Sequence, residues 1–242
     1  MGEQIHLGKW TEERLTDLIT EASLIHAPGD RIAFLSKDFL NTKYRDSTLT
    51  GERNVPEVFV INLEFFDCFT FIEYVDAMRM SNSFSGFREH LRNVRYHSGH
   101  ISYKNRNHFF TDWKAFNADF IVDMTNYIGA DRTKDVSKRL NEKDDGTLFL
   151  PGVACRLREV TYIPSLYVNN EVIENLNTGD YAGIYSKKEG LDVSHVGIII
   201  KEQDAVTFRH ASSLRKHRKV IDEDFRDYLR AKPGIIILRA RE

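Results

Sequence analysis

Cys68 is predicted to lie at the start of a helix, a position that can make a thiol reactive. Cys68 follows Asp67, a good N-cap residue, and begins an apolar-faced helical pattern that ends near Arg79. Its sulfur would lie near the positive end of a helix dipole, which favours the thiolate, the nucleophilic form of cysteine. A buried, inert structural cysteine is the alternative that this position alone leaves open.

Two histidines in the last third of the chain are the partners that such a nucleophile needs. The segments that contain them, 194–200 and 205–210, are rich in β-branched and aromatic residues and are predicted to be consecutive strands. A tight hairpin would place His195 directly opposite His210, with Cβ atoms about 4.5–5.5 Å apart. The other residues on that face of the hairpin would be Gly197, Ile199, Val206 and Phe208.

These side chains could together hydrolyse an amide. Cys68 would attack the carbonyl carbon, and His195 would take the thiol proton and later protonate the leaving amine. His210 would orient the ring of His195, and the backbone N–H of Cys68 would stabilise the oxyanion. This chemistry requires the helix that begins at Cys68 to dock on the face of the predicted hairpin. Either histidine alone is more simply a hydrogen-bonded, partly buried ring.

The elements that must position these residues change in kind along the chain. Apolar residues at helical spacing predict helices over about residues 10–25, 32–39, 68–79 and 112–127, with loop-like or polar connections over 41–56 and 134–146. Short strands are predicted over 160–163, 181–185, 195–200, 205–210 and 235–238. Helices followed by strands are typical of an α+β fold. No linker or repeat divides the chain, so we expect a single domain over residues 1–242.

Length, composition and charge exclude several classes of protein. With 242 residues, 41% hydrophobic and 29% charged, the chain is neither disordered nor fibrous. Its 34 basic and 36 acidic residues give a net charge of −2, so no overall field attracts nucleic acid or anionic lipid. No segment approaches the roughly 18 apolar residues that a membrane-spanning helix needs. Two cysteines exclude a four-cysteine zinc site, and a Cys68–Cys155 disulfide is not expected because it would consume the nucleophile.

Several separated motifs occur in an order that is more specific than any one of them. They are residues 66–73 (FDCFTFIE), 95–96 with 106–109, 112–113, 179–180, 194–198 (SHVGI) and 210–213 (HASS). In this order they resemble the N-acetylmuramoyl-L-alanine amidase-like family, a branch of the NlpC-type, papain-like cell-wall hydrolases. The similarity spans about residues 44–239. It implies a papain-like α+β fold, with the nucleophile helix packed on a mainly antiparallel C-terminal sheet, and a triad of Cys68, His195 and His210.

The resemblance also implies an activity. It predicts cleavage of the amide between N-acetylmuramic acid and L-alanine in soluble peptidoglycan fragments that carry anhydro-muramic acid, with no metal or other cofactor. The alternatives are an endopeptidase that cuts between D-glutamate and the diamino acid, and an inactive muropeptide-binding module. A papain-like acyltransferase acting on lipids is disfavoured, because no amphipathic helix with a basic polar face is present.

The expected location follows from the expected substrate. Peptidoglycan fragments arise outside the cytoplasmic membrane, so we expect a periplasmic or secreted protein, with cytoplasmic recycling as the alternative. The first residues lack the basic and apolar segments of a secretory signal, which a mature protein would have lost.

Basic and aromatic residues are interleaved between residues 88 and 113. Such a segment could bind single-stranded nucleic acid, could donate two metal ligands through His97 and His100, or could form one wall of a cleft. The absence of net positive charge and of a further ligand pair favours the cleft wall, a lobe over about residues 86–130. Arginine is suited to gripping the carboxylates of muropeptides. The predicted substrate-binding residues are Tyr44, Asp67, Arg95, Tyr96, Asn107, His108, Trp113 and Ser194, with structural stacking and capping as the alternative for those in 95–113.

Overall fold

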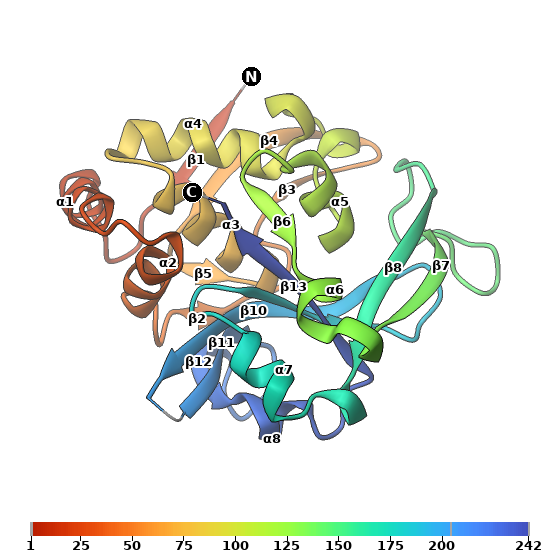
Figure 1. Ribbon diagram of the computed structural model, residues 1–242. Coiled ribbons are helices and arrows are strands. Elements are labelled where there is room, and N and C mark those ends of the chain that lie inside the picture. Colours follow the sequence, from red (N-terminus) through yellow and green to blue (C-terminus); the bar gives the residue numbers. More distant parts are fainter. Residues whose placement is uncertain (1, 204, 242) are drawn as a thin grey trace.

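The computed structural model describes residues 2–203 and 205–241, and it has mixed α+β architecture (Figure 1). The helices are α1 (Glu12–Ser23), α2 (Pro28–Lys37), α3 (Cys68–Arg79), α4 (Phe84–Arg95), α5 (Phe110–Phe116), α6 (Thr125–Gly129), α7 (Asn170–Asn175) and α8 (Phe225–Leu229), with 3-10 turns η1 (His97–Gly99), η2 (Tyr103–Asn105), η3 (Ala130–Arg132) and η4 (Ser165–Tyr167). The strands are β1 (Glu3–His6), β2 (Lys43–Tyr44), β3 (Thr50–Glu52), β4 (Val55–Asn62), β5 (Phe65–Phe66), β6 (Ile121–Asp123), β7 (Lys134–Leu140), β8 (Arg156–Pro164), β9 (Tyr181–Tyr185), β10 (Val193–Glu202), β11 (Ala205–Ser212), β12 (Lys219–Asp224) and β13 (Gly234–Ala240).

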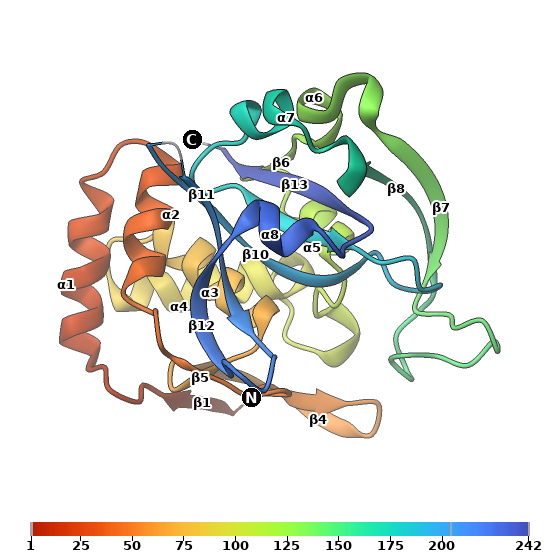
Figure 2. The same ribbon diagram turned by 90° about the horizontal axis from the view of Figure 1, so that it is seen from below.

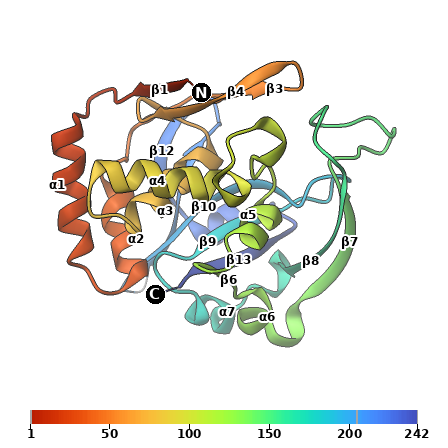
Figure 3. The same cartoon turned by 90° about the horizontal axis from the view of Figure 1, so that it is seen from above.

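A large, mainly antiparallel sheet forms the centre of the molecule. Its strand order is β5-β2-β12-β11-β10-β9-β13-β8-β7, and β6 pairs with β13. A small second sheet has the order β1-β4-β3. Figure 3 shows this small sheet along one side of the molecule, α4 lying over α3, and the β7–β8 hairpin projecting at another edge. The α+β fold class predicted from the sequence is confirmed.

The helix that begins at Cys68 has a strong local reason to start there. Asp67 has an extended backbone and its carboxylate accepts from the backbone N–H groups of Phe69 and Thr70, at 2.9 and 2.7 Å. The Thr70 hydroxyl in turn accepts from the Asp67 backbone N–H at 3.1 Å, which completes a capping box. From Thr70 to Arg79 every residue is buried. The predicted helix over residues 68–79 is therefore confirmed.

The two faces of the large sheet are covered by different helices. Figures 1 and 2 place α3 and α4 on one side of β10 and α8 on the other. The β10 residues that share an apolar cluster with α3 are Val196, Ile198 and Ile200. The opposite face belongs to a second cluster, which contains Ile199, Val206 and Phe208 together with Phe225 and Leu229 of α8.

The predicted docking face for α3 is therefore wrong. Alternate residues of a strand point to opposite faces, and α3 lies over the even-numbered residues of β10. Gly197 does not provide the close approach for α3 that was predicted. A Cβ atom there would come within 2.6 Å of the Phe208 ring and 2.7 Å of the Arg209 carbonyl oxygen, so this glycine makes room for Phe208.

The predicted register of the histidine hairpin is also wrong, by two residues. Ile198 pairs with Arg209, and continuing this register puts Gly197, not His195, across from His210. The strands are joined one residue later than predicted, and moving the centre of a hairpin by one residue moves the partner by two. A shift of two keeps each side chain on its face. His195 and His210 are therefore diagonal neighbours on one face.

Other predicted elements are confirmed in part. The predicted strands over 181–185, 195–200, 205–210 and 235–238 correspond to β9, β10, β11 and β13, and the predicted helix over 10–25 corresponds to α1. The predicted helix over 112–127 is instead α5, β6 and α6, and the segments 41–56 and 134–146 contain strands where loops were expected. Pairing with other strands decides these segments, and for β2 and β6 the partners β12 and β13 are distant in the chain, so local periodicity does not report the pairing.

Candidate active site

The Cys68 sulfur lies at the N-terminus of α3, against strand β10. The nearby backbone N–H groups of Val196, Cys68 and Phe69 act to lower the pKa of this thiol and so favour its thiolate. Burial and the nearby Asp67 carboxylate oppose them and raise the pKa of the thiol to about 12. The resting thiol is therefore protonated, although the helix terminus was expected to favour the thiolate, because desolvation outweighs the N–H groups here.

The two histidines are joined to each other and to a carboxylate. His195 Nε2 is 2.7 Å from His210 Nδ1, and His210 Nε2 is 2.8 Å from Glu223 Oε2. Their rings meet edge to face, with centroids 4.8 Å apart. His195 comes directly before Val196, whose backbone N–H is among the groups that act to lower the pKa of Cys68. The structure thus brings Cys68, His195 and His210 to one region of the sheet, where β10 meets the start of α3.

Both imidazoles are held in the neutral form. Burial, and after it the charge of His210, lowers the pKa of His195 to about 3. Burial, and after it the charge of His217, lowers the pKa of His210 to about 4. A neutral imidazole has one nitrogen free to accept a proton. Because the thiol is also neutral, this site would begin its reaction from an uncharged thiol and imidazole.

Two predicted site residues flank the thiol. The Tyr44 hydroxyl donates to Asp46 Oδ1 at 2.6 Å. Burial, this hydrogen bond and the proximity of Cys68 all raise the pKa of Tyr44. Asp67 acts as the cap of α3 and lines the cavity described below.

Ser194, another predicted substrate-binding residue, is exposed, and its hydroxyl is 3.4 Å from the Ile184 carbonyl oxygen.

Two residues that the sequence interpretation missed lie on the α8 side of the histidines. The Tyr228 ring is 5.1 Å from the His210 ring, and burial, Glu223 and Cys68 all raise the pKa of Tyr228. The Lys232 ammonium lies over the Tyr228 ring at 4.7 Å and lowers the pKa of both histidines. Glu223 was missed as well. Strand β12 was not predicted, although Val220 and Ile221 within it are a short β-branched signal.

A cavity of about 560 Å³ opens beside the start of α3. Asp67 lies in its wall, and Arg53, Arg106 and His108 contribute positive or polar groups. The other lining residues are Ser47, Thr48, Leu49, Gly51, Glu52, Asn54, Tyr103, Phe149, Leu150 and Pro151. The β3 hairpin, the η2 segment and the 149–151 loop therefore surround a polar hollow that Asp67, the residue before Cys68, also lines. An adjoining, more apolar cavity of about 350 Å³ shares Glu52, Arg53 and Tyr103.

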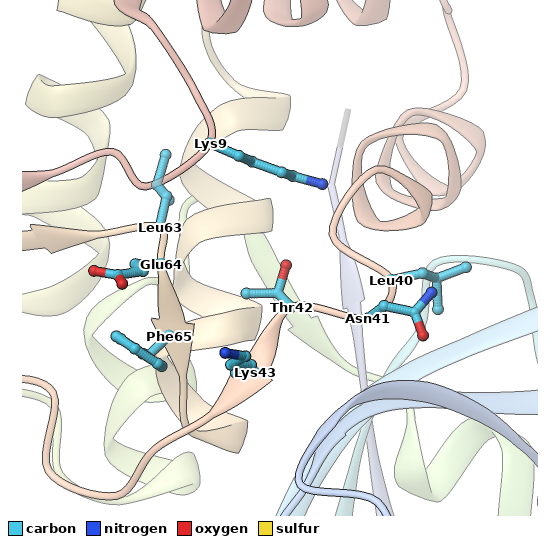
Figure 4. A pocket seen from close by; sticks show the side chains of 8 residues that line it. All are labelled: Lys9, Leu40, Asn41, Thr42, Lys43, Leu63, Glu64 and Phe65. Atoms are coloured by element: carbon cyan, nitrogen blue, oxygen red, sulfur yellow. The ribbon is translucent and has the colours of Figure 1, made fainter.

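A smaller cavity of about 250 Å³ lies between the 40–43 segment and β5 (Figure 4). Lys9 and Lys43 are among its lining residues, and Figure 4 shows the long Lys9 side chain extended across its rim. The Lys9 ammonium contacts the Asp38 carbonyl oxygen at 3.4 Å and lies over the Trp10 ring. None of Cys68, His195 and His210 lines either cavity, but Asp67, the residue before Cys68, lines the cavity of about 560 Å³ and not this one, so we do not assign the smaller cavity to the reaction.

Four predicted substrate-binding residues are buried in the protein and serve its structure. Arg95 is fully buried, pairs with Glu73 at 2.8 Å and donates to the Val60 carbonyl oxygen at 2.6 Å. The Tyr96 hydroxyl donates to Glu57 at 2.7 Å.

The other two are equally enclosed. The Asn107 amide donates to the Val94 carbonyl oxygen at 3.0 Å, and the buried Trp113 ring stacks on Phe110 and meets Tyr181 edge to face. These four side chains have no solvent-facing surface for a ligand, so the alternative of structural stacking and capping describes them. His108 differs, because it lines the large cavity, where its Nε2 is 2.7 Å from the Tyr103 carbonyl oxygen.

Some further features of the described residues concern metals, disulfides and membranes. Over residues 2–203 and 205–241, no group of three or more His, Cys, Asp or Glu side chains converges as a metal site would. His97, one of the two histidines considered above as metal ligands, stacks on Phe116, with ring centroids 4.0 Å apart. Cys68 and Cys155 are free thiols. No helix in the described part of the chain is long and apolar enough to span a membrane.

The fold and this site define an α+β protein with a helix-terminal cysteine beside paired histidines. Residues 34–235 match the AmiA-like family, described as N-acetylmuramoyl-L-alanine amidase-like. The match covers most of the chain, which therefore belongs to this family. No curated protein matches the chain in sequence.

Solved structures share the fold. A protein from Legionella pneumophila str. Philadelphia 1 is 25% identical with a TM-score of 0.81, and the alignment covers 96% of this chain and 94% of that chain. An N-acetylmuramoyl-L-alanine amidase from Bacteroides uniformis ATCC 8492 is 24% identical with a TM-score of 0.73, covering 89% of this chain and 99% of that chain. At this level of identity the amidase comparison establishes the fold.

Proposed function

We propose that this protein is a cysteine amidase that hydrolyses the bond between N-acetylmuramic acid and L-alanine in peptidoglycan fragments. Family membership supports the amidase class. The observation that carries the catalytic assignment is one juxtaposition: Cys68 begins α3, which packs against β10, and β10 supplies His195, whose ring is hydrogen-bonded to His210. We include in the proposal a papain-like arrangement of a single domain and a periplasmic or secreted place of action, where such fragments arise.

In the first half of the proposed reaction, the protein forms a thioester. His195 uses Nε2 to contact His210, which leaves Nδ1 as the nitrogen available to the thiol. As the Cys68 proton moves to this nitrogen, the sulfur attacks the lactyl carbonyl carbon, and the carbonyl oxygen becomes an oxyanion. The Cys68 backbone N–H, at the positive end of α3, is placed to stabilise that charge. The tetrahedral species collapses when the C–N bond breaks, and His195 gives its proton to the leaving amino group of L-alanine.

In the second half, water replaces the amine. Neutral His195 accepts a proton from a water molecule while the oxygen of that water attacks the thioester carbon. The C–S bond then breaks, the sulfur recovers the proton from His195, and the muramic acid leaves as a carboxylic acid. Because the thiol and the imidazole both begin and end neutral, the pKa directions of Cys68 and His195 are compatible with this cycle.

The large cavity is the proposed place for the part of the fragment beside the scissile bond. Its wall contains Asp67, adjacent to the nucleophile, and the exposed side chain of Arg53. Muropeptides carry several carboxylates, which arginine binds well. Arg106 is already bonded to Glu57, so Arg53 is the cavity arginine that we assign to the substrate.

The test uses purified protein and soluble muropeptides, with products identified by mass spectrometry. We expect Cys68→Ala to lower the rate by a factor on the order of 10⁶, the scale found when a hydrolase loses its nucleophile. Cys155→Ser, which replaces the other free thiol, should keep full activity, and EDTA should change nothing. The released peptide should be the complete stem, beginning at L-alanine.

Other outcomes distinguish the alternatives. Activity retained in Cys68→Ala, or lost with chelator, would reject the cysteine mechanism. Products cut between D-glutamate and the diamino acid would identify an endopeptidase that uses the same residues. Saturable binding of muropeptides without turnover in the unmodified protein would identify a binding module.

A further inference from the structure

Glu223 on β12 continues the line of hydrogen bonds that begins at His195. Three neighbouring strands each supply one residue: β10 supplies His195, β11 supplies His210 and β12 supplies Glu223. Glu223 pairs with Phe208, so it lies on the same face as His210 and diagonal to it. Diagonal neighbours in a sheet are within reach of long and aromatic side chains. The three side chains therefore form a diagonal row, with 2.7 and 2.8 Å between the hydrogen-bonding atoms.

The Glu223 carboxylate at the end of this row sets the donor and the acceptor of both hydrogen bonds in it. A carboxylate only accepts, so the Nε2 of His210 must donate to Glu223. A neutral imidazole carries a single N–H, which leaves the Nδ1 of His210 as an acceptor. The Nε2 of His195 must then donate to His210, and the Nδ1 of His195 keeps its lone pair.

We propose that Glu223 is a positioning residue for the amidase reaction, which fixes the tautomers of both histidines so that Nδ1 of His195 can accept the thiol proton. This inference rests on the proposed function of Cys68. With the opposite tautomers, Nδ1 of His195 would carry a proton and could not accept another from the thiol. Glu223 would act through two imidazoles without touching the substrate. Its role therefore resembles that of the carboxylate behind the histidine of a serine protease.

The groups around Glu223 are compatible with this role. From the loop before β12, His217 Nε2 is 3.8 Å from Glu223 Oε1. From α8, Tyr228 has a pKa raised in part by Glu223, and Lys232 beyond it lowers the pKa of both histidines. The neighbouring carboxylate on β12, Asp222, instead pairs with Arg209 at 2.8 Å. Glu223 is thus the β12 carboxylate bonded to the histidine row.

The decisive variant is Glu223→Gln, because an amide of the same shape can also donate. Its NH₂ group can bind the Nε2 of His210 and reverse both tautomers. In a serine protease, the corresponding change lowers kcat by about 10⁴, and we expect on the order of 10² here because the carboxylate is one residue further from the base. KM should stay within about twofold, and Glu223→Asp should recover part of the rate. Asp222→Asn removes a nearby negative charge outside the row and should leave the tautomers and kcat unchanged.

A spectroscopic measurement separates positioning from mere structural support. In the unmodified protein, ¹⁵N–¹H correlations of the imidazoles should show His195 and His210 both as Nε2–H tautomers. Glu223→Gln should increase the Nδ1–H form of both.

Two results would overturn the inference. One is an Nδ1–H tautomer of His195 in the unmodified protein, a measurement that does not depend on any variant folding. The other is a folded Glu223→Gln variant with kcat within twofold of the unmodified protein and unchanged tautomers. Activity that survives Cys68→Ala would instead reject the proposed function itself.

Discussion

The buried ion pair of Arg95 allows a direct test of whether this arginine, predicted to bind substrate, instead stabilises the protein. Arg95 and Glu73 have side chains that are 0% and 2% exposed, and their charged groups are 2.8 Å apart. The Arg95 guanidinium also donates to the Val60 carbonyl oxygen and lies 5.2 Å from the centre of the Tyr74 ring. Arg95→Met keeps much of the volume of the side chain but leaves the Glu73 carboxylate without its cation in the protein interior.

The expected loss of stability is large. Removing one member of a buried ion pair costs about 3–5 kcal/mol, against a total stability of about 5–15 kcal/mol for a typical domain. Arg88 offers a matched control, because it pairs with Glu3 at the surface with side chains 41% and 29% exposed. Arg88→Met should cost about 0–1 kcal/mol, since exposed pairs contribute little. The double variant Glu73→Gln/Arg95→Met removes the stranded charge and should regain part of the loss.

Urea unfolding followed by circular dichroism measures these free energies, and kinetics on muropeptides provide the second measurement. A structural Arg95 predicts a large decrease in the free energy of unfolding and an unchanged KM in the folded fraction. A loss below about 1 kcal/mol together with a raised KM would refute the reasoning and return Arg95 to the substrate site.

Further predictions concern the pH dependence of activity and of stability, and the role of the cavity. Catalysis needs neutral His195, whose pKa is lowered to about 3, so kcat/KM should not fall between pH 7 and 5; an acid limb near pH 6.5 in folded protein would contradict this. The same lowered pKa means that the unfolded state binds the proton first, so thermal stability should decrease as the pH falls from about 6.5 toward 3. Arg53→Ala should raise KM about fivefold with kcat unchanged, as expected for about 1 kcal/mol from an exposed ion pair, and the effect should shrink in high salt. Arg230→Ala, an exposed arginine outside the cavity, is the control, and an equal effect in both variants would exclude a specific contact by Arg53.

The sequence by itself determined the local features of the site. Asp67 followed by Thr70 specifies a helix that begins at Cys68, because a capping box depends only on neighbouring residues. The β-branched runs around His195 and His210 specified two strands and the face that the histidines share, because side chains alternate along a strand whatever its partners. The order of the motifs indicated the amidase-like family, which the family match over residues 34–235 shows.

The tertiary structure alone decided how these pieces meet. The face of β10 that receives α3 depends on which apolar residues pack together in the folded protein, and the register of the hairpin depends on where its turn closes. The burial of Arg95 depends on Glu73, a residue 22 positions away in the chain. Glu223 joins the histidines because β12 lies beside β11. Contacts between residues distant in sequence leave no local pattern in the sequence. The stability of each such contact depends on a partner residue that comes close only when the chain has folded.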